Sequence, residues 1–560
     1  MKKSKLAAAI ALLSCYPGAA FSDTVFEEIS VVAQKREQSV QEVGIAITAL
    51  TGDQLEALGF DNAQQVTAMA PGVQTVQPNG EANYSVGIRG VTNSDFTTNV
   101  ESPVALYVDE VYISQMSGAG FSLFDLERVE ILRGPQGTLF GRNATGGLVH
   151  FITRKPTFYQ EGYAKITLGD YNQRKFEGAY SNELTESLAA RLSVNINKAD
   201  GYIDNRYTGD KLNNANDKTV RLQLLYNPAD NVEALFNFRY SDQDIDTGFF
   251  ENVSSIRAGE LTPDEMNPVL GYIDNDGDVY AGDYDDPGFN ELETNGATAT
   301  IKWTISDDVK LVSITDISNV ERTYIEDTDA SPVPLFNFFL TTDAKQISQE
   351  LRLEGSVGEL QWVVGGYYLD LDINDSNGAI SEPFIGGGGT TVEGSEGGLY
   401  NPYISTLTSQ SLFGQIEYPL ATDLTLIAGM RLIQDEKEFD FSVNAVEFLN
   451  PESKPGFADD SNIALQAMLG EYNASRKDTE VASRLQLNWF PVEDILTYVS
   501  WNRGVKGGGY NAPIFPLTPP NYYDDDTLSY DPEQLDAYEI GVKSDVGEYG
   551  RLNVAAYYYD

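Results

Sequence analysis

The sequence has almost no cysteine or histidine, few basic residues and no long apolar run beyond its start. One Cys and one His in 560 residues argue against a disulfide scaffold, a zinc site and His-based catalysis. No apolar stretch of about 18 residues follows position 22, so the sequence predicts no transmembrane helix. With 37 basic and 84 acidic residues the net charge is −47, and the basic surface that a nucleic-acid partner needs is missing.

The composition favours an exported protein that is rich in β structure. The chain has 32 Tyr, 26 Phe and 50 Gly, a balance typical of strands with aromatic surfaces. Residues 1–22 are typical of a signal peptide, because lysines precede an apolar core from Leu6 to Leu13 and small residues end at Ser22. The alternative is a lipoprotein signal that ends at "LLSC", in which Cys15 carries lipid.

From residue 157 to residue 560, segments of about ten residues alternate between apolar and polar side chains. In "NVEALFNFRY" every second residue from Val232 to Tyr240 is apolar, and "RLQLNW" repeats the pattern at Leu485, Leu487 and Trp489. About 15 such segments predict the antiparallel strands of an all-β transmembrane barrel. The alternative is a soluble β-sandwich with one hydrated face.

The connections between these segments favour the barrel. Short links alternate with long ones, as expected when tight turns lie at one end of a barrel and long loops at the other. The short links are residues 226–231, 305–308, 418–423 and 490–494, and the long ones are 242–293, 376–402 and 447–478.

Residues 41–156 have a different pattern and predict a compact α+β domain. Short apolar pieces alternate with glycines, and "TGDQLEALG" predicts a helix with Thr51 as N-cap, Leu55 and Leu58 on one face, and Gly59 at its end. Arginines are concentrated in this domain, whereas the rest of the chain is acidic. We therefore expect the domain to dock inside a polar lumen.

Five motifs resemble those of a known family: "YSVGIRGV" (84–91), "VALYVDEVYI" (104–113), "LERVEILRGPQGTLFGRNATGGLVHFITRKP" (126–156), "YVSWNRGVKGGGYN" (498–511) and "YDPEQLDAYEIGVKSD" (530–545). On these motifs the chain resembles the TonB-dependent outer-membrane receptors of Gram-negative bacteria. The resemblance implies an N-terminal plug in the lumen of a barrel of about 22 strands. Because the chain stops at "LNVAAYYYD", with about seven strands missing and an unpaired edge in lipid, we expect a C-terminally truncated protein.

A β-prone segment, "EEISVVAQ", lies in the stretch 23–40 that precedes the plug. Polar residues follow it without a second strand, so we expect an unpaired strand in a flexible segment. The resemblance implies a TonB box that adds as a strand to TonB, which works with the ExbB/ExbD complex. Its residues are Glu27, Glu28, Ile29, Ser30, Val31, Val32, Ala33 and Gln34. The alternative is the first strand of the plug.

The resemblance also implies a latch between plug and barrel. Arginines at its motifs pair with barrel glutamates, and the matching residues are Arg89, Arg133 and Glu539. An ordinary lumen salt bridge without a gating role is the alternative. For ligand binding we expect the plug apices, with Asn93, Asp95, Phe96 and Asn99 in the first and Gln115 in the second, although both stretches are also consistent with plain turns.

The long loop 242–293 is strongly acidic. In "DNDGDVYAGDYDD" the carboxylates are spaced as in a calcium loop, but Gly277 stands at position 4 and no Glu stands at 12, so an EF-hand is excluded. A looser Ca²⁺ site at Asp274, Asp276 and Asp278 is one hypothesis, and a hydrated acidic loop is the other. We expect no other cofactor.

Together these features predict energy-coupled uptake of a scarce extracellular ligand across the outer membrane, and no enzyme. With His150 as the one histidine, haem and a Ser–His hydrolase are disfavoured. A ferric siderophore or similar iron chelate leads on family frequency. Cobalamin, a saccharide or another organic nutrient is the alternative, and a passive porin is less compatible with a plug.

Overall fold

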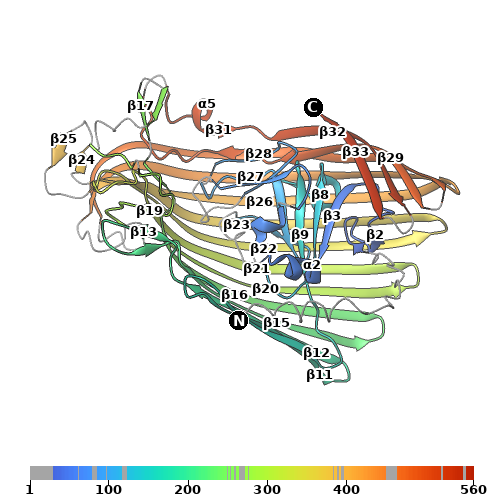
Figure 1. The fold of residues 1–560 in the computed structure, drawn as a ribbon. Helices are drawn as coiled ribbons and strands as arrows, with labels where there is room; N and C mark the ends of the chain where they lie inside the picture. The colour runs from blue at the N-terminus through green and yellow to red at the C-terminus, as the bar shows by residue number, and fades with distance from the viewer. Residues whose placement is uncertain are drawn as a thin grey trace, which may run out of the picture.

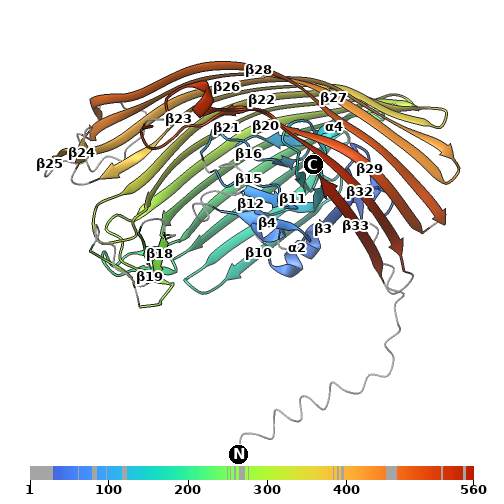
Figure 2. The ribbon, with the colours of Figure 1, turned by 90° about the horizontal axis from the view of Figure 1, so that it is seen from above.

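In the computed structural model an inner domain lies in the concave side of a large, curved, open antiparallel sheet (Figure 1). We call the inner domain the plug and the sheet the wall. Seen from above, the wall arches around the plug (Figure 2). The structure describes residues 29–60, 62–67, 69–77, 85–95, 97–115, 123–248, 250–252, 254–257, 260–263, 271–274, 276–381, 384–386, 390–392, 397–448, 463–492, 494–518, 521–546 and 550–560.

Five strands form the central sheet of the plug. Their order is β3 (Ala46–Thr51), β8 (Leu126–Arg133), β9 (Gly147–Thr153), β6 (Val104–Val108) and β7 (Val111–Ile113), and only β6 and β9 run parallel. All seven residues of β9 are buried, as expected for a central, mostly apolar strand covered on both faces. Separately, β4 (Val73–Val76) pairs antiparallel with β5 (Ser85–Ile88). The prediction of an α+β plug is therefore confirmed.

Helix α2 (Gly52–Leu58) follows the sequence prediction closely. The Thr51 side chain accepts from the backbone of Gln54, whose side chain accepts in return, and Gly59 ends the helix with φ +73°. The predicted apolar face is wrong at one position, since Leu55 is buried but Leu58 is 46% exposed. The other plug helices are α3 (Ala63–Thr67) and α4 (Gly137–Phe140).

The wall contains 15 antiparallel strands, which confirms the predicted number among the described residues. In order they are β10 (Glu161–Leu168), β11 (Arg174–Thr185), β12 (Leu188–Ala199), β15 (Ala215–Ala229), β16 (Val232–Thr247), β20 (Gly288–Ser306), β21 (Val309–Asp327), β22 (Asn337–Val357), β23 (Leu360–Ser381), β26 (Gly397–Ala421), β27 (Leu424–Phe448), β28 (Ile463–Val492), β29 (Ile495–Lys506), β32 (Glu533–Asp545) and β33 (Arg551–Tyr559).

The remaining helices and strands are short. They are β1 (Ser30–Val31), β2 (Gln38–Ser39), β13 (Ile203–Asn205), β14 (Lys211–Leu212), β17 (Ser254–Arg257), β18 (Glu260–Pro263), β19 (Ala281–Gly282), β24 (Phe384–Gly386), β25 (Thr390–Val392), β30 (Gly509–Tyr510), α5 (Asp525–Leu528) and β31 (Ser529–Tyr530). No described helix has the length and apolar character needed to cross a membrane.

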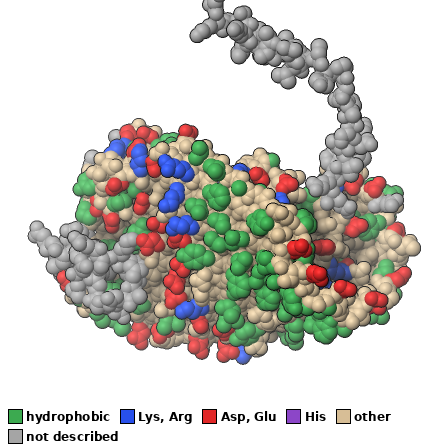
Figure 3. Space-filling model, turned by 90° about the horizontal axis from the view of Figure 1, so that it is seen from below, with side chains coloured by type: hydrophobic (Ala, Val, Ile, Leu, Met, Phe, Trp, Pro, Cys, Tyr) green, Lys and Arg blue, Asp and Glu red, His purple; other side chains and the backbone are tan. Residues whose placement is uncertain are grey.

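The two faces of the wall differ as the period-2 pattern predicts. Outward residues such as Phe238, Ile317 and Leu412 are 46%, 52% and 71% exposed, whereas inward residues such as Gln223 and Asn237 are buried against the plug. In Figure 3 hydrophobic side chains gather over the middle of the face shown, with charged side chains toward its margins. An apolar outer band with a polar interior suits a lipid-facing wall.

The links between wall strands alternate in length, but the long loops are shorter than the sequence analysis predicts. Two-residue links join β15 to β16 and β20 to β21 at one end of the wall. At the other end the strands continue into the predicted loops, and residues 463–478 belong to β28, not to a loop. In the extension of β28 the residues from Ile463 to Gly470 do not alternate between apolar and polar, which is why the sequence pattern did not reveal it.

Candidate functional site: the interface between plug and wall

The N-terminal segment folds back on itself beside the plug. Ser30 pairs with Ser39 and Val31 with Gln38 in a short antiparallel hairpin. The chain reverses at Lys35, whose φ is 60° and whose N–H donates to the carbonyl of Val32 at 2.9 Å. The expectation of a strand without a partner is therefore wrong, because this reversal lacks the Gly and Pro signals on which turn prediction relies.

The predicted TonB box is docked and not free. Val31 and Ala33 are buried, and the Val32 N–H donates to the buried carboxylate of Glu130 at 3.0 Å. Ile29 is half-buried, whereas Ser30 is exposed and accessible to a partner. Gln34 is also buried, and Glu27 and Glu28 lie outside the described residues.

The docked segment borders an open cavity of about 1250 Å³ at the short-turn end of the wall. Lys35 spans the gap between the two parts, since its Nζ lies 3.4 Å from Glu110 of the plug and 3.4 Å from Glu350 of the wall. Burial favours the neutral form of Glu110, but Arg352 and Lys35 outweigh it and lower the pKa of this carboxyl. A partner that displaces Lys35 has to separate these ion pairs, whereas Ser30 of the same segment is already exposed.

His150 has a structural place beside this cluster. Its Nε2 accepts a hydrogen bond from the Glu110 N–H at 3.0 Å, and burial lowers the pKa of the imidazole to about 3. The side chain is therefore neutral at physiological pH. A neutral, buried imidazole that accepts from backbone does not provide an accessible base.

Of the two arginines in the predicted latch, Arg89 forms an ion pair with Glu539. Arg89 Nη1 lies 2.6 Å from Glu539 and donates to the Tyr559 hydroxyl at 2.9 Å, and its guanidinium stacks 3.9 Å from the centre of the Tyr557 ring. Arg89 and Gly90 both have positive φ angles, 54° and 84°. Glycine adopts such a conformation without strain, which allows the tight turn after Arg89.

Arg133 does not pair with Glu539. It donates to the carbonyl of Ala46 at 3.4 Å and to that of Pro71 at 3.1 Å, both within the plug. The structure thus brings two of the three predicted latch residues together, and a role in gating stays a prediction.

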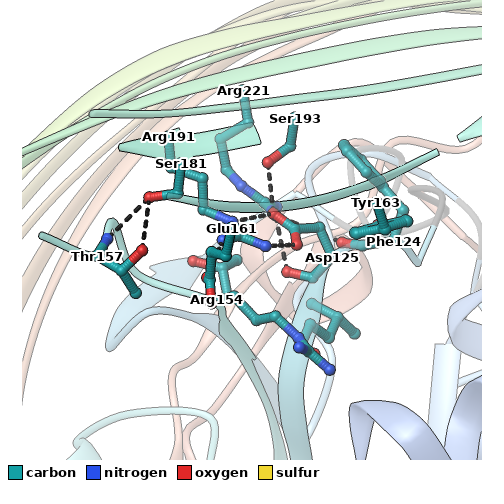
Figure 4. Close-up of polar contacts among 12 residues, drawn as sticks. Phe124, Asp125, Arg154, Thr157, Glu161, Tyr163, Ser181, Arg191, Ser193 and Arg221 are labelled. Atoms are coloured by element: carbon teal, nitrogen blue, oxygen red, sulfur yellow. Dashed lines mark hydrogen bonds and ion pairs between the residues drawn. The ribbon is translucent and has the colours of Figure 1, made fainter. Parts of the chain in front are cut away.

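Asp125 makes the most completely buried link between plug and wall (Figure 4). Its carboxylate accepts from Arg191 Nε at 2.8 Å, from Arg221 Nη2 at 3.3 Å and from the Ser193 hydroxyl. Arg191 also pairs with Glu161 at 2.7 Å. Two guanidinium groups of neighbouring wall strands therefore converge on one plug carboxylate.

A second buried network lies beside α4. Glu101 pairs with Arg142 at 2.7 Å and with Lys437 of the wall at 3.0 Å, while Arg142 also reaches Asp435 at 3.1 Å. Burial alone would raise the pKa of Glu101, but Arg142 and Lys437 together lower it to about 2. Glu101 is thus held in its charged form by one cation of the plug and one of the wall.

The first plug apex is folded against the wall. Asn93 Oδ1 accepts from the Asp95 N–H at 3.0 Å, and Asp95 accepts from the Thr97 N–H at 2.9 Å, which is turn geometry. Asn99 is buried and donates from Nδ2 to the carbonyl of Tyr510 at 2.6 Å. Phe96 lies outside the described residues. A ligand-binding role for these residues stays a prediction.

The second apex contributes Gln115, which is buried beside a small cavity of about 140 Å³ between plug and wall. Binding sites for drug-sized ligands are typically several hundred Å³ in volume. The cavity at Gln115 is therefore too small for a metal chelate in the conformation described.

The acidic loop has a basic partner that the sequence analysis did not pair with it. Arg206 lies 3.1 Å from Asp283 and forms further ion pairs with Asp274 and Asp276. Asp278 is exposed, and its carboxylate accepts from the Tyr280 N–H at 3.1 Å. One oxygen each of Glu251, Asp274 and Asp276 lies within 4.8 Å of the others, so the donor set suits Ca²⁺ while Arg206 competes for it.

Sequence reasoning missed Asp125, Glu101 and Glu110 as contacts of the wall. Their partners Arg191, Lys437 and Arg352 lie far along the chain, in other strands. For Asp125 and Glu101 the one available signal was that each acid stands among apolar or small residues, where an unpaired charge is costly.

Two family models match the chain, the TonB-dependent receptor plug domain at residues 39–148 and the TonB-dependent receptor-like β-barrel at residues 153–560. A plug held by ion pairs inside an antiparallel, outwardly apolar wall defines a plugged outer-membrane receptor. The chain belongs to the TonB-dependent receptor family, as its motifs indicate.

Similar proteins include receptors for different ligands. The chain is 27% identical to a vitamin B12 transporter, BtuB, of Photobacterium profundum over 208 residues, which are 36% of this chain and 33% of the transporter. It is 24% identical to a ferrioxamine receptor of Yersinia enterocolitica over 31% of this chain and 24% of the receptor. The ferric yersiniabactin uptake receptor FyuA of Yersinia pestis has the same fold, with a TM-score of 0.73 at 18% identity over 92% of this chain and 72% of FyuA.

The matched stretches thus cover a third or less of these curated relatives. Proteins of this family are receptors and transporters of the Gram-negative outer membrane that depend on TonB. The predicted domain boundaries and the roles of individual residues stay predictions.

Proposed function

We propose that the protein is an outer-membrane receptor that takes up a scarce small ligand, using energy delivered by TonB and the ExbB/ExbD complex. Its outer face contacts lipid, and its ligand enters from outside the cell. We propose no catalytic activity for it. A ferric siderophore or similar iron chelate is the favoured ligand, because similar proteins include a ferrioxamine receptor and share the fold of a ferric yersiniabactin receptor.

The observation that carries the proposal is the docked N-terminal segment at the short-turn mouth. Val31 and Ala33 are buried, yet Ser30 stays exposed beside them. A partner that adds a strand at Ser30 can pull on the segment and transmit force to Glu130 and Glu110 of the plug. A passive porin is less consistent with a plug held by buried ion pairs.

The test removes residues 27–34 from the full-length receptor. We expect uptake to be lost while ligand binding at the cell surface is retained, because binding needs only the outer side. In a finer version, Ser30→Pro removes a backbone donor and should stop uptake, whereas Ser30→Ala keeps every backbone donor and should not. Uptake that survives the deletion would contradict the proposal.

Two finer points are open to experiment. Cobalamin is the second candidate ligand, because of the similarity to a vitamin B12 transporter, and growth under iron or cobalamin limitation separates the two. Ca²⁺ binding at Asp274, Asp276 and Asp278 is also proposed, with Arg206 as its competitor. Calcium titration of the receptor and of Asp274→Asn tests it, and equal heats for both would refute it.

A further inference from the structure

The long loop between β29 and β32 folds down into the lumen and contacts the plug. The Gly507 N–H donates to Asn143 of the plug at 3.2 Å. Tyr510 stacks on Phe439 with ring centres 5.3 Å apart and planes 9° from parallel, and Ala512 and Leu528 join the same apolar cluster. The loop therefore occupies the space in which a ligand from outside meets the plug.

Within this loop, residues 509–514 form an extended stretch with one edge already paired. Gly509 pairs with Tyr530 and Tyr510 with Ser529, and the Asn511 N–H donates to the carbonyl of Leu528 at 2.8 Å. Alternate residues of an extended chain direct their carbonyls to the same edge. The carbonyls of residues 510, 512 and 514 are thus left for the opposite edge.

Three asparagine side chains bind that opposite edge. Asn99 of the plug donates to the carbonyl of Tyr510 at 2.6 Å, Asn377 of β23 to that of Ala512 at 3.2 Å, and Asn401 of β26 to that of Ile514 at 2.8 Å. Asn401 also donates to Asn377 Oδ1 at 3.0 Å. We call these three residues the amide row. It contacts every second carbonyl, as a neighbouring β-strand would.

The amide row also has unused acceptors. Asn99 is 8% exposed and Asn401 is 0% exposed, yet the Oδ1 atom of each accepts no hydrogen bond from any described residue. Buried polar atoms in folded proteins are nearly always paired. The loop therefore accepts hydrogen bonds from the N–H groups of the row but donates none to Asn99 Oδ1 and Asn401 Oδ1. Another occupant with N–H donors at these two positions would bind the row more completely.

We propose that the amide row is a binding site for an extended peptide backbone, and that loop residues 510–514 occupy this site until a ligand displaces them. A primary amide offers both a donor and an acceptor, so a row of three reads the alternating C=O and N–H groups of a peptide edge. The inference rests on the proposed function and names its ligand class: a peptide, or a metal chelate built on a peptide backbone.

The neighbouring side chains suit such a ligand. Phe439, Tyr472 and Tyr510 form an aromatic cluster beside the row, which provides apolar surface for ligand side chains. If the row served only to anchor the loop, the three hydrogen bonds to loop carbonyls would be explained. The two buried oxygens without donors, Asn99 Oδ1 and Asn401 Oδ1, would not be.

The experiment uses the full-length receptor in detergent, with residues 509–530 replaced by a short Gly-Ser linker. The probe is the capped peptide Tyr-Asn-Ala-Pro-Ile, which has the sequence of residues 510–514, and binding is measured by saturation-transfer NMR or calorimetry. We expect the shortened receptor to bind it. The intact receptor should bind at least tenfold more weakly, because its tethered loop competes at high effective concentration.

Substitutions in the row give the specific readout. Asn377→Leu and Asn401→Leu should each weaken peptide binding about threefold to tenfold, as expected for one lost hydrogen bond. Asn374→Leu is the matched control, since Asn374 stands on the same strand but is exposed on the other face, and it should change nothing. A second arm uses the peptide with a C-terminal ferric hydroxamate, to distinguish an iron-bearing ligand from a plain peptide.

Failure of both probes to bind the shortened receptor, or equal binding by the Asn377 and Asn374 variants, would overturn the inference. If the shortened receptor does not fold, a spin label at Ile514→Cys in the intact receptor replaces it: millimolar peptide should release the label, and an unchanged spectrum overturns the inference equally. None of these measurements involves TonB. A failure here is therefore distinct from failure of the proposed uptake, which the deletion of residues 27–34 tests.

Discussion

Replacing Asp125 by asparagine tests whether buried ion pairs hold the plug in the wall. The substitution keeps the size of the side chain and removes the charge that Arg191 and Arg221 share. Arg191 keeps its pair with Glu161 at 2.7 Å, whereas Arg221 loses its one carboxylate partner among the described residues. Breaking a buried pair costs about 3–5 kcal/mol, and because the amide oxygen still accepts a hydrogen bond we expect about 3 kcal/mol.

The assay is urea-induced release of the plug from the full-length receptor, followed by pulse proteolysis. Asp53→Asn is the matched control, because the carboxylate of Asp53 is 84% exposed and its partner Arg154 is 42% exposed. Exposed pairs contribute less than about 1 kcal/mol, so this variant should release its plug nearly like the wild type. If Asp125→Asn is no more destabilising than Asp53→Asn, buried charge does not hold the plug.

Two further predictions concern the same interface. Arg89→Gln and Glu539→Gln should show a coupling energy of about 2 kcal/mol in a double-mutant cycle on plug release. Arg133→Gln and Glu539→Gln should show a clearly smaller coupling, because Arg133 lies in the field of Glu539 but donates to plug carbonyls and forms no salt bridge with it. A coupling energy between Arg133 and Glu539 as large as that between Arg89 and Glu539 would show that Arg89 is not the main partner of Glu539 in holding the plug. In the folded protein Arg142 of the plug and Lys437 of the wall lower the pKa of Glu101 from 4.5 to about 2, so its contribution of about 3 kcal/mol is complete above the unfolded pKa and is lost as the pH falls toward 2. Urea titrations at pH 6 and pH 3 should show a larger loss of stability in the wild type than in Glu101→Gln, in which Glu110 and Glu350 still titrate, and identical losses would contradict the assignment.

Features of the fold that depend on local sequence were predictable. Period-2 alternation identified the wall strands, because each strand has one face in lipid and one toward the plug. The cap of α2 was equally local, since Thr51, Gln54 and Gly59 lie within nine residues. The strand extensions escaped prediction where apolar and polar residues do not alternate, as at residues 463–470 of β28.

The site was less predictable because its contacts join distant parts of the chain. Arg89 and Glu539 were inferred only from the family resemblance, and Asp125 with Arg191 was not inferred at all. The amide row combines one residue of the plug with one residue from each of two strands, so Asn99, Asn377 and Asn401 share no spacing that a sequence pattern can express. The hairpin that ties down Val31 was missed because its turn at Lys35 carries no characteristic residues.

The height of the wall has a consequence for transport. Strand β28 has 30 residues, or about 100 Å at about 3.3 Å per residue, whereas about 9–11 residues cross a bilayer. Because the turns at one end are tight, most of the strand length beyond the bilayer extends from the other end of the wall. If the proposed uptake is correct, a ligand first meets the protein several nanometres from the lipid, and a pull on the N-terminal segment has to act over the remaining length of the strands.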